Sequence, residues 1–333
     1  MKGQGTGCDT AKSVVAPLAR LWDCDLRAAQ LAFSEVLTPD APIHLAHPFE
    51  TLAGPADFAD RAIALLYKAM PDLERRDAIV MAGSDARGAC WVGMGGQYIG
   101  TFHAPFLGIP PTGRTATLRY HEFFRIEGAR AVEMQALWDL PELMMQAGVW
   151  PLAPSLGREW TVPAPASQDG RVIDGDGAHA LQVVGDMLTA LGRSRDGVDA
   201  MDLPRYWHPR ASWYGPSGIG TARGIEGFRA HHQIPFLDAM PDRRALIEKG
   251  HMFAEGDYVG FTAWPGMEMT LSGGGWLGLA GAGQTLTMRS LDFWRVEGDL
   301  IRENWVLVDL LDVFNQLGVD VFERMRALPG WRG

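Results

Sequence analysis

Apolar residues recur at two different periods along this chain, and the two periods separate helices from strands. From residue 10 to residue 37 they return every three or four positions, which predicts an amphipathic helix. A second helix is predicted from Pro55 to Met70, because proline suits a first helical turn and Pro71 cannot extend a helix. A short strand is predicted at 43–47, and from residue 78 the period is two, which predicts strands at 78–82, 88–99, 115–126 and 131–138 before a last helix from Pro141.

The second half of the chain repeats this order of elements. The predictions there are a helix at 178–191, a strand at 212–214, a helix at 225–240, strands up to Val308 and a closing helix up to Arg326. A shift of 170 positions superposes the halves without a gap, so that Phe123–Gly128 fall on Phe293–Gly298 and Arg119 falls on Arg289. Repeats of solenoids and propellers are only about 20 to 50 residues long, so each half is predicted to be a whole domain.

A stretch rich in proline and small residues separates the halves. Residues 150–170 contain four prolines among alanine, serine and glycine, which is typical of a linker. We therefore expect a first domain at 1–150, a linker at 151–175 and a second domain at 176–333. Helices followed by long antiparallel strands predict the α+β class, with one curved sheet wrapped around helices on a single face.

Composition and charge narrow the classes of protein that fit this pattern. With 47% hydrophobic residues in a chain of 333, each half is large enough to bury a core of its own. The net charge of −10 disfavours nucleic acid and anionic membrane surfaces as partners, because both are bound through an excess of Lys and Arg. No apolar run approaches the roughly 20 residues of a membrane helix, and the Gly-rich start lacks a secretory pattern, so we expect a cytoplasmic protein.

Cysteines and histidines give little indication of a metal site. Cys8, Cys24 and Cys90 are odd in number and lack metal-ligand spacing, so we expect three free thiols in a reducing compartment. The histidines that suggest a metal are His44, His47, His103 and His121, but the second half has Tyr214, Ser217, Gly273 and Leu291 at the equivalent positions. We therefore expect ordinary hydrogen-bonded histidines and no metal.

A run of short motifs near the C-terminus carries a family resemblance. An acidic turn at Glu297 precedes a strand with Glu303, Trp305 and Asp309, and a helix ending in Gln316-Leu317-Gly318 follows. This order is similar to the C-terminal signature of SnoaL-like polyketide cyclases of the NTF2-like superfamily. The resemblance covers residues 178–326 and, more faintly, 10–149. It implies two NTF2-like cones, each a curved antiparallel sheet wrapped around helices.

The resemblance also implies a chemistry and a site. SnoaL-like cyclases close a ring by an intramolecular aldol reaction without metal or cofactor, and an Asp of the last strand serves as acid and base. That role maps onto Asp309 and, through the repeat, onto Asp139. The first copy departs from the signature, since Gln135 stands where the second has Trp305. The partner implied is a small hydrophobic carbonyl compound.

The residues themselves leave two interpretations of these aspartates open. Side chains alternate along a strand, so Glu303, Trp305 and Asp309 share one face, and burial there would raise the carboxyl pKa towards neutrality. An Asp between a strand and a helix is also a common helix N-cap, and Pro141 after Asp139 fits a cap. A carboxylate that only caps would have a lowered pKa.

The remaining candidate site residues are further polar and aromatic side chains of the predicted strands. Arg119 and Arg289 can bind a substrate carbonyl or pair with an acid, and tryptophans in strands can line a cavity or fill a core. An epoxide hydrolase of this superfamily would need an Arg-x-Asp pair, which is absent because His121 and Leu291 stand at the third position. The candidate substrate-binding side chains are Trp305, Gln135, Glu303, Arg289, Arg119, His121, His47 and Trp213.

A non-catalytic alternative belongs to another class of protein. NTF2-like domains serve many unrelated functions, so the chain can equally be a module that binds an apolar ligand or pairs domains. Single NTF2-like domains commonly dimerise through the open sheet face. We therefore expect the two copies to pair within one chain, as a pseudo-dimer that is a monomer in solution.

Overall fold

The computed structural model describes residues 8, 10–193 and 197–329, and the start that was predicted to lack a secretory signal lies largely outside them. The chain divides into two compact units. The first domain comprises Met1–Pro151, Ala166–Val172 and Asp320–Gly333, and the second comprises Leu152–Pro165 and Ile173–Val319. Residues 151–175 are thus shared between the domains, and the last segment of the chain belongs to the first domain. Within the described residues, no helix combines the length and apolar character needed to cross a membrane.

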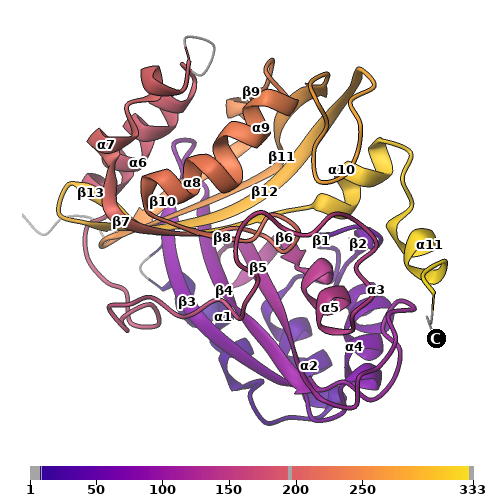
Figure 1. Cartoon of the computed structure of the whole chain (residues 1–333). Coiled ribbons are helices and arrows are strands. Elements are labelled where there is room, and N and C mark those ends of the chain that lie inside the picture. The colour runs from indigo at the N-terminus through magenta and orange to yellow at the C-terminus, as the bar shows by residue number, and fades with distance from the viewer. Residues whose placement is uncertain (1–7, 9, 194–196, 330–333) are drawn as a thin grey trace, which may run out of the picture. The chain divides into compact units, whose positions relative to one another are not determined.

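The first domain is built on a six-stranded sheet in the order β2-β1-β6-β5-β4-β3 (Figure 1). All neighbouring strands are antiparallel except β1 and β6, which are parallel. Its elements are α1 (Ala11–Val15), η1 (Leu18–Arg20), α2 (Leu26–Val36), β1 (Pro42–Leu45), β2 (Glu50–Ala53), α3 (Pro55–Phe58), η2 (Ala59–Ile63), α4 (Ala64–Ala69), β3 (Glu74–Ser84), β4 (Cys90–Thr101), β5 (Thr115–Glu127), β6 (Arg130–Trp138), α5 (Leu140–Gln146) and, from the end of the chain, α11 (Val321–Arg326).

The second domain repeats this topology with a sheet in the order β10-β11-β12-β13-β7-β8, to which β9 adds at β11. Here β13 and β7 are the parallel pair. Its elements are α6 (Ala178–Leu191), η4 (Val198–Met201), α7 (Leu203–Tyr206), β7 (Trp207–Tyr214), β8 (Thr221–Arg223), α8 (Gly224–Phe228), η5 (Arg229–Gln233), α9 (Ile234–Ala239), β9 (Arg244–Ala245), η6 (Ile247–Lys249), β10 (Gly250–Glu255), β11 (Tyr258–Leu271), β12 (Gln284–Glu297), β13 (Leu300–Val308) and α10 (Leu310–Gln316).

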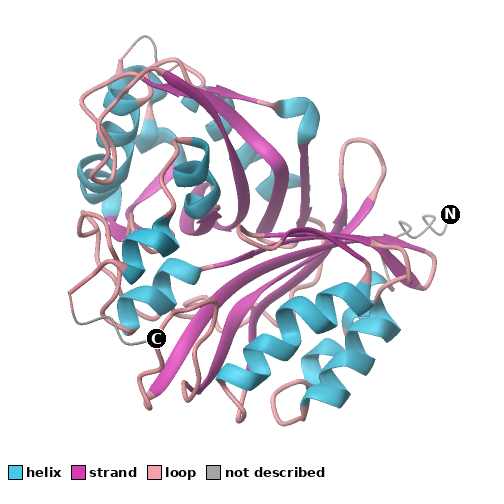
Figure 2. Ribbon diagram, turned by 90° about the vertical axis from the view of Figure 1, so that its right-hand side faces the viewer, coloured by secondary structure: helices cyan, strands magenta, loops and turns pink. Residues whose placement is uncertain are grey.

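In each domain the helices lie mainly against one face of a curved, largely antiparallel sheet, which confirms the predicted α+β class (Figure 2). We call this the inner face. In the first domain it carries Trp138, whose ring contacts Phe58 of α3 at 5.9 Å. In the second domain it carries Met252, whose methyl group lies within van der Waals reach of Gly185 on α6. The opposite side of each sheet is the outer face.

Most predicted elements are present, and the differences have local causes. The helix predicted for residues 10–37 is broken, because Asp25 starts a new helix by accepting a hydrogen bond from the Ala28 amide at 2.8 Å. The helices predicted at 55–70 and 225–240 each contain a π-helical turn, η2 and η5, at positions that match under the 170-residue shift. Strands β2 and β8, of four and three residues, are present in the structure and were not predicted.

The expectation of three free thiols is wrong for two of them. Cys8 and Cys90 form a disulfide, with their Cα atoms 5.7 Å apart and a sequence separation of 82 residues. The pairing depends on tertiary structure, because α1 after Cys8 packs on the β3–β4 hairpin that contains Cys90. Only Cys24 is free among the described cysteines, and its sulfur lies 3.1 Å from the Tyr67 hydroxyl.

Candidate active site

The predicted aspartate of the first domain ends β6 beside an arginine of β5. Arg119 Nη2 lies 3.1 Å from Asp139 Oδ2, and both side chains are buried. Glu142, one turn into α5, accepts hydrogen bonds from the Arg119 amide at 2.6 Å and from the Thr117 hydroxyl at 2.8 Å. Burial, and next the charge of Asp139, raise the pKa of Glu142 to about 7. The site is therefore a compact group in which Asp139 binds the side chain of Arg119 and Glu142 binds its backbone amide.

The equivalent site of the second domain has the same pair and one further bond. Arg289 Nη1 lies 3.0 Å from Asp309 Oδ2, and Asp309 Oδ1 accepts the Asp312 amide at 3.2 Å. Asp309 therefore caps α10, whereas the Asp139 side chain makes no cap hydrogen bond to α5. The guanidinium of Arg289 also lies over the Trp264 ring, 4.7 Å from its centre.

The glutamine of the C-terminal motif holds the last helix on the sheet. Gln316 accepts the Thr287 amide at 2.8 Å and donates to the Thr287 carbonyl at 2.9 Å. Gln146 makes the same two bonds to Thr117 in the first domain, at 2.8 and 2.7 Å. This motif residue thus has the same structural role in both copies.

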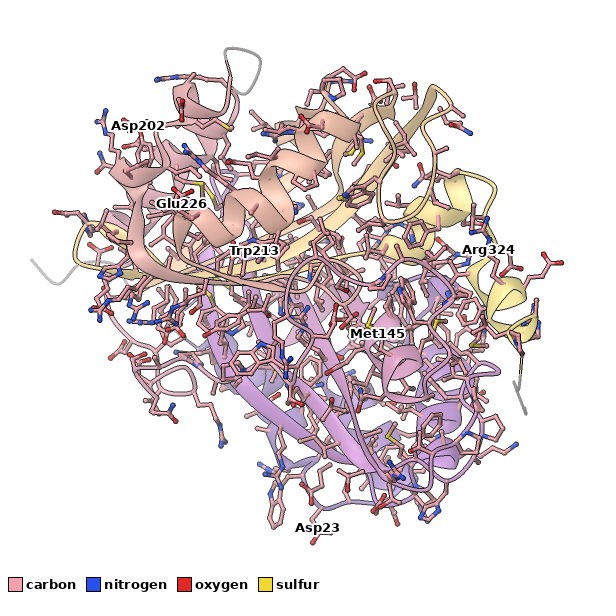
Figure 3. The ribbon with its side chains drawn as sticks, in the orientation of Figure 1. Asp23, Met145, Asp202, Trp213, Glu226 and Arg324 are labelled. Carbon is pink, nitrogen blue, oxygen red and sulfur yellow. A yellow bond between two sulfur atoms is a disulfide. The ribbon has the colours of Figure 1, made fainter. Side chains whose placement is uncertain are left out.

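The predicted substrate-binding residues do not share one face. Glu303 and Trp305 lie on the outer face, where Glu303 pairs with Arg295 at 2.7 Å and the Trp305 ring packs on Tyr214 at 5.3 Å. Trp213 lies on the inner face beneath α8, with its ring against Phe228 at 5.5 Å (Figure 3). The structure therefore separates the two tryptophans that the pattern grouped as cavity-lining candidates.

Three further candidates belong to the first domain. Gln135 is on the outer face and donates to Glu133 at 2.8 Å. His121, also on that face, is buried opposite Leu137. His47 Nδ1 lies 3.0 Å from a Glu50 carboxylate oxygen. Within the described part of the chain, no three His, Cys, Asp or Glu side chains come together in a group that suits a metal ion.

A buried acid on the inner face was missed in both domains. In the first it is Glu122, with no exposed surface, and its carboxylate accepts from Arg75 at 2.7 Å, Tyr98 at 3.0 Å and Trp138 at 3.0 Å. Arg75 in turn lies 2.9 Å from Asp77 and 4.2 Å above the centre of the Tyr120 ring. This acid is fully enclosed by hydrogen-bond donors of its own domain.

In the second domain the equivalent acid is Asp292, which has far fewer partners. It is 7% exposed, and its Oδ2 accepts the Ser290 hydroxyl at 2.8 Å. Its Oδ1 is buried without a hydrogen-bond partner among the described residues. Burial raises the pKa of Asp292 to about 7, and the Ser290 bond offsets this only in part. A carboxyl in this state can both donate and accept a proton near neutral pH.

The register of the sheet places Asp292 on the inner face. Asp292 is paired with Phe261 of β11, and Phe261 is paired with Met252 of β10, so the three side chains point to the same side. Met252 is the residue that reaches α6. The sequence held a signal for this acid, since Glu122 and Asp292 coincide under the repeat shift and each interrupts an apolar strand.

The chain is similar to one protein family and to several solved structures. The family described as SnoaL-like polyketide cyclase matches twice, at residues 19–147 and 185–317. No curated protein matches the chain significantly. Among solved structures, AclR from Streptomyces galilaeus is 20% identical, with a TM-score of 0.36, over 43% of this chain and 98% of its own. IdmH from Streptomyces antibioticus is 22% identical, with a TM-score of 0.33, over 41% and 96%.

Proposed function

Since the chain belongs to the SnoaL-like polyketide cyclase family, we propose that it is an acid–base enzyme acting on a small hydrophobic carbonyl compound. The observation that carries this proposal is Asp292, a buried inner-face carboxyl with one unpartnered oxygen and a pKa raised to about 7. Native proteins pair nearly all buried polar atoms, so such an oxygen needs an explanation, and a bound substrate supplies one.

The reaction proposed is an intramolecular aldol closure. The Asp292 carboxylate takes a proton from the carbon beside a substrate carbonyl, and the resulting enolate forms a carbon–carbon bond to a second carbonyl carbon of the same molecule. The alkoxide left on that second carbonyl takes the proton back from Asp292. No electron or atom enters or leaves, so the closure needs no redox partner. A positioned acid–base group of this kind contributes roughly 10² to 10⁴ in rate.

Asp309 and Asp139 remain the candidates that the family signature indicates. Each lies within 3.1 Å of an arginine, Asp309 with Arg289 and Asp139 with Arg119. Each of these carboxylates is thus already held in an ion pair by an arginine of its own domain. Asp292 makes no ion pair with a cation of the described residues, and its pKa is raised to about 7, so it fits the double role of acid and base better.

Deuterium exchange into a simple ketone tests the proton transfer without knowledge of the substrate. The probe is 2-tetralone in D₂O, whose α-protons exchange when a base removes them and an acid returns deuterium. We expect the wild type to accelerate the exchange and Asp292→Asn to lose about 10²-fold or more of that acceleration. Asp309→Asn is the comparison variant, with a retained fold checked by circular dichroism for both.

The outcomes separate the candidates and the rival class. If Asp292→Asn keeps the full acceleration of exchange and Asp309→Asn loses it, the proton transfer is assigned to Asp309. Full acceleration in both variants contradicts acid–base catalysis by either carboxyl. A wild type that binds 2-tetralone without accelerating exchange supports the alternative, a non-catalytic module for apolar ligands.

We also propose that the two copies act as a pseudo-dimer within one chain. The support is the repeat itself, since two like domains joined by a short linker are held at a high effective concentration. The chain should then sediment as a monomer at micromolar concentration. A tight dimer of whole chains in sedimentation equilibrium would overturn this part of the proposal.

A further inference from the structure

On the inner face of the first domain, both carboxylate oxygens of the buried acid Glu122 already accept hydrogen bonds. Three donors, from Arg75, Tyr98 and Trp138, occupy the two oxygens of Glu122. Tyr120 closes the group from the side by donating to Asp77. A ligand could reach Glu122 only by displacing a buried guanidinium from its carboxylates, which is strongly unfavourable.

The second domain lacks every one of those donors. The sheet register puts Ala245 at the position of Arg75 and Met267 at that of Tyr98, and the 170-residue shift puts Val308 at that of Trp138. Asp292 therefore keeps only the Ser290 hydroxyl. Two residues further along β12, the buried indole nitrogen of Trp294 also has no hydrogen-bond partner among the described residues. Where the first domain has a closed cluster, the second therefore has a carboxylate oxygen of Asp292 and an indole N–H of Trp294 that both lack a hydrogen-bond partner among the described residues.

The π-helical turn shows the same contrast between the domains. Its first-domain copy, η2, has Ala62 and Ile63, which carry no polar side-chain atoms. Its second-domain copy, η5, has His232 and Gln233 at the same positions. π-Helical turns inside α-helices are frequent at functional sites. The polar residues that distinguish the second copy from the first therefore lie in the π-helical turn, where the helix geometry is unusual.

Gln233 is 4% exposed and poorly satisfied. Its Nε2 donates only to the Met201 sulfur, at 3.5 Å, and its Oε1 is buried without a hydrogen-bond partner in the described part of the chain. A thioether is a weak acceptor, so both ends of the amide have unused hydrogen-bonding capacity. A hydroxyl group can donate to the amide oxygen or accept from the amide nitrogen, whichever end faces it.

His232 adds an aromatic surface beside this amide. Its ring stacks on Trp213 at 4.2 Å with an angle of 12° between the planes, and Phe236 lies on another side at 5.5 Å. Burial, and then the charge of Arg243, lower the pKa of His232 to about 3, so the imidazole is neutral. Its Nδ1 is buried and has no hydrogen-bond partner among the described residues.

We propose that the second domain alone holds the ligand, that Gln233 recognises a hydroxyl group on it, and that the first domain is a closed structural copy. This inference rests on the proposed function, which assumes that the ligand binds at the inner face. It adds that there is one binding site per chain and that Gln233 determines specificity. The ligand class is a planar hydrophobic carbonyl compound that carries a hydroxyl group.

Binding of two matched probes tests the inference independently of turnover. The probes are 2-tetralone and 6-hydroxy-2-tetralone, titrated by calorimetry into the full chain. We expect one site per chain and tighter binding of the hydroxylated probe. Gln233→Leu should weaken binding of the hydroxylated probe about tenfold and leave that of 2-tetralone unchanged, since one hydrogen bond contributes on the order of that factor.

The repeat supplies the matched control. Ile63→Leu puts the same residue at the equivalent position of the first domain and should leave both affinities at the wild-type value. Two sites per chain, equal weakening by both variants, or wild-type selectivity in Gln233→Leu would each overturn the inference. So would the absence of binding by either probe at millimolar concentration. Titration of Asp292→Asn keeps the two proposals apart, because it should bind the probes even where deuterium exchange is lost.

Discussion

Equivalent acids have opposite surroundings in the two domains. Glu122 lies in a closed network with Arg75, while Asp292 is held by one serine hydroxyl. The first arrangement satisfies a buried charge, and the second keeps a carboxyl partly protonated near neutral pH. Of two repeat-equivalent acids, one is therefore fully hydrogen-bonded, while the other has a carboxylate oxygen without a partner among the described residues.

The pH dependence of stability follows from the two raised carboxyl pKa values. Asp292 and Glu142 hold protons up to a pKa of about 7 in the folded chain and release them above about 4 in the unfolded chain. Between these limits the folded state binds more protons, so its stabilisation is complete below pH 4 and is lost as pH rises through 7. Urea midpoints at pH 5 and pH 8 measure the loss.

Two variants test whether Asp292 and Glu142 cause this loss of stability at higher pH. Asp292→Asn and Glu142→Gln should each reduce the difference between the two midpoints, because neither amide titrates. Between pH 5 and pH 8 the largest effect per residue is on the order of 2–3 kcal/mol, because about two units of the pKa shift fall in that range. Midpoint differences equal to that of the wild type in both variants would contradict the raised pKa values.

Arg75 should be among the most sensitive positions of the first domain. Arg75→Met leaves Glu122 buried without its cation and should lower the free energy of unfolding by about 3–5 kcal/mol. The adjacent Arg76 is an exposed arginine paired with Glu74, so Arg76→Met is a matched control with an expected loss of about 1 kcal/mol or less. Similar losses from both variants, measured by urea unfolding, would disprove the role of the buried network.

At the scale of elements, the last strand and the last helix of each copy are joined by the motif that carries the family resemblance. Glu303 pairs with Arg295 across β12 and β13, and Gln316 bonds Thr287 from α10. These bonds recur in the first domain between Glu133 and Arg125 and between Gln146 and Thr117. The motif is thus informative about fold because its polar residues are structural.

Capping differs between the two last helices and gives a prediction at this scale. Asp309 caps α10 and Asp139 makes no cap bond to α5. Asn keeps a cap acceptor and Ala does not, so Asp309→Ala should cost about 1 kcal/mol more than Asp309→Asn in thermal or urea unfolding. At Asp139 the Ala–Asn difference should be smaller, because no cap bond is lost there and only the bond to Arg119 distinguishes the two variants. An equal Ala–Asn difference at both positions would contradict the asymmetry.

At the scale of the whole molecule, the disulfide ties the start of the chain to the sheet of the first domain. Closing a loop of 82 residues restricts the unfolded chain, and bridges of this kind stabilise proteins by about 2–4 kcal/mol. Cys8→Ser should lower the thermal midpoint of the first domain, and the wild type should fall to the same midpoint in excess reductant.

Cys24 provides the control for that experiment. It is free, and Cys24→Ser retains a hydroxyl that can bond Tyr67, so its midpoint should still depend on reductant as in the wild type. Reductant that leaves the wild-type midpoint unchanged would show that the bridge does not contribute to stability.

The repeat, the α+β class, the order of most elements and the family resemblance can all be derived from the amino-acid sequence. These depend on local periodicity and on residues close together along the chain, such as the run from Glu297 to Gly318. The 170-residue shift also aligned Arg119 with Arg289 and Asp139 with Asp309, and the structure shows each arginine paired with its aspartate.

The contacts between side chains distant in sequence became known from the folded structure. Cys8 and Cys90 are 82 residues apart, and Arg75 reaches Glu122 from a strand two places away in the sheet. It also decided which acid is enclosed and which is left unsatisfied, because burial and partners come from neighbouring strands and helices. Periodicity fixes the face of a strand on which a residue lies, but the charge or donor opposite it is set by packing between distant segments.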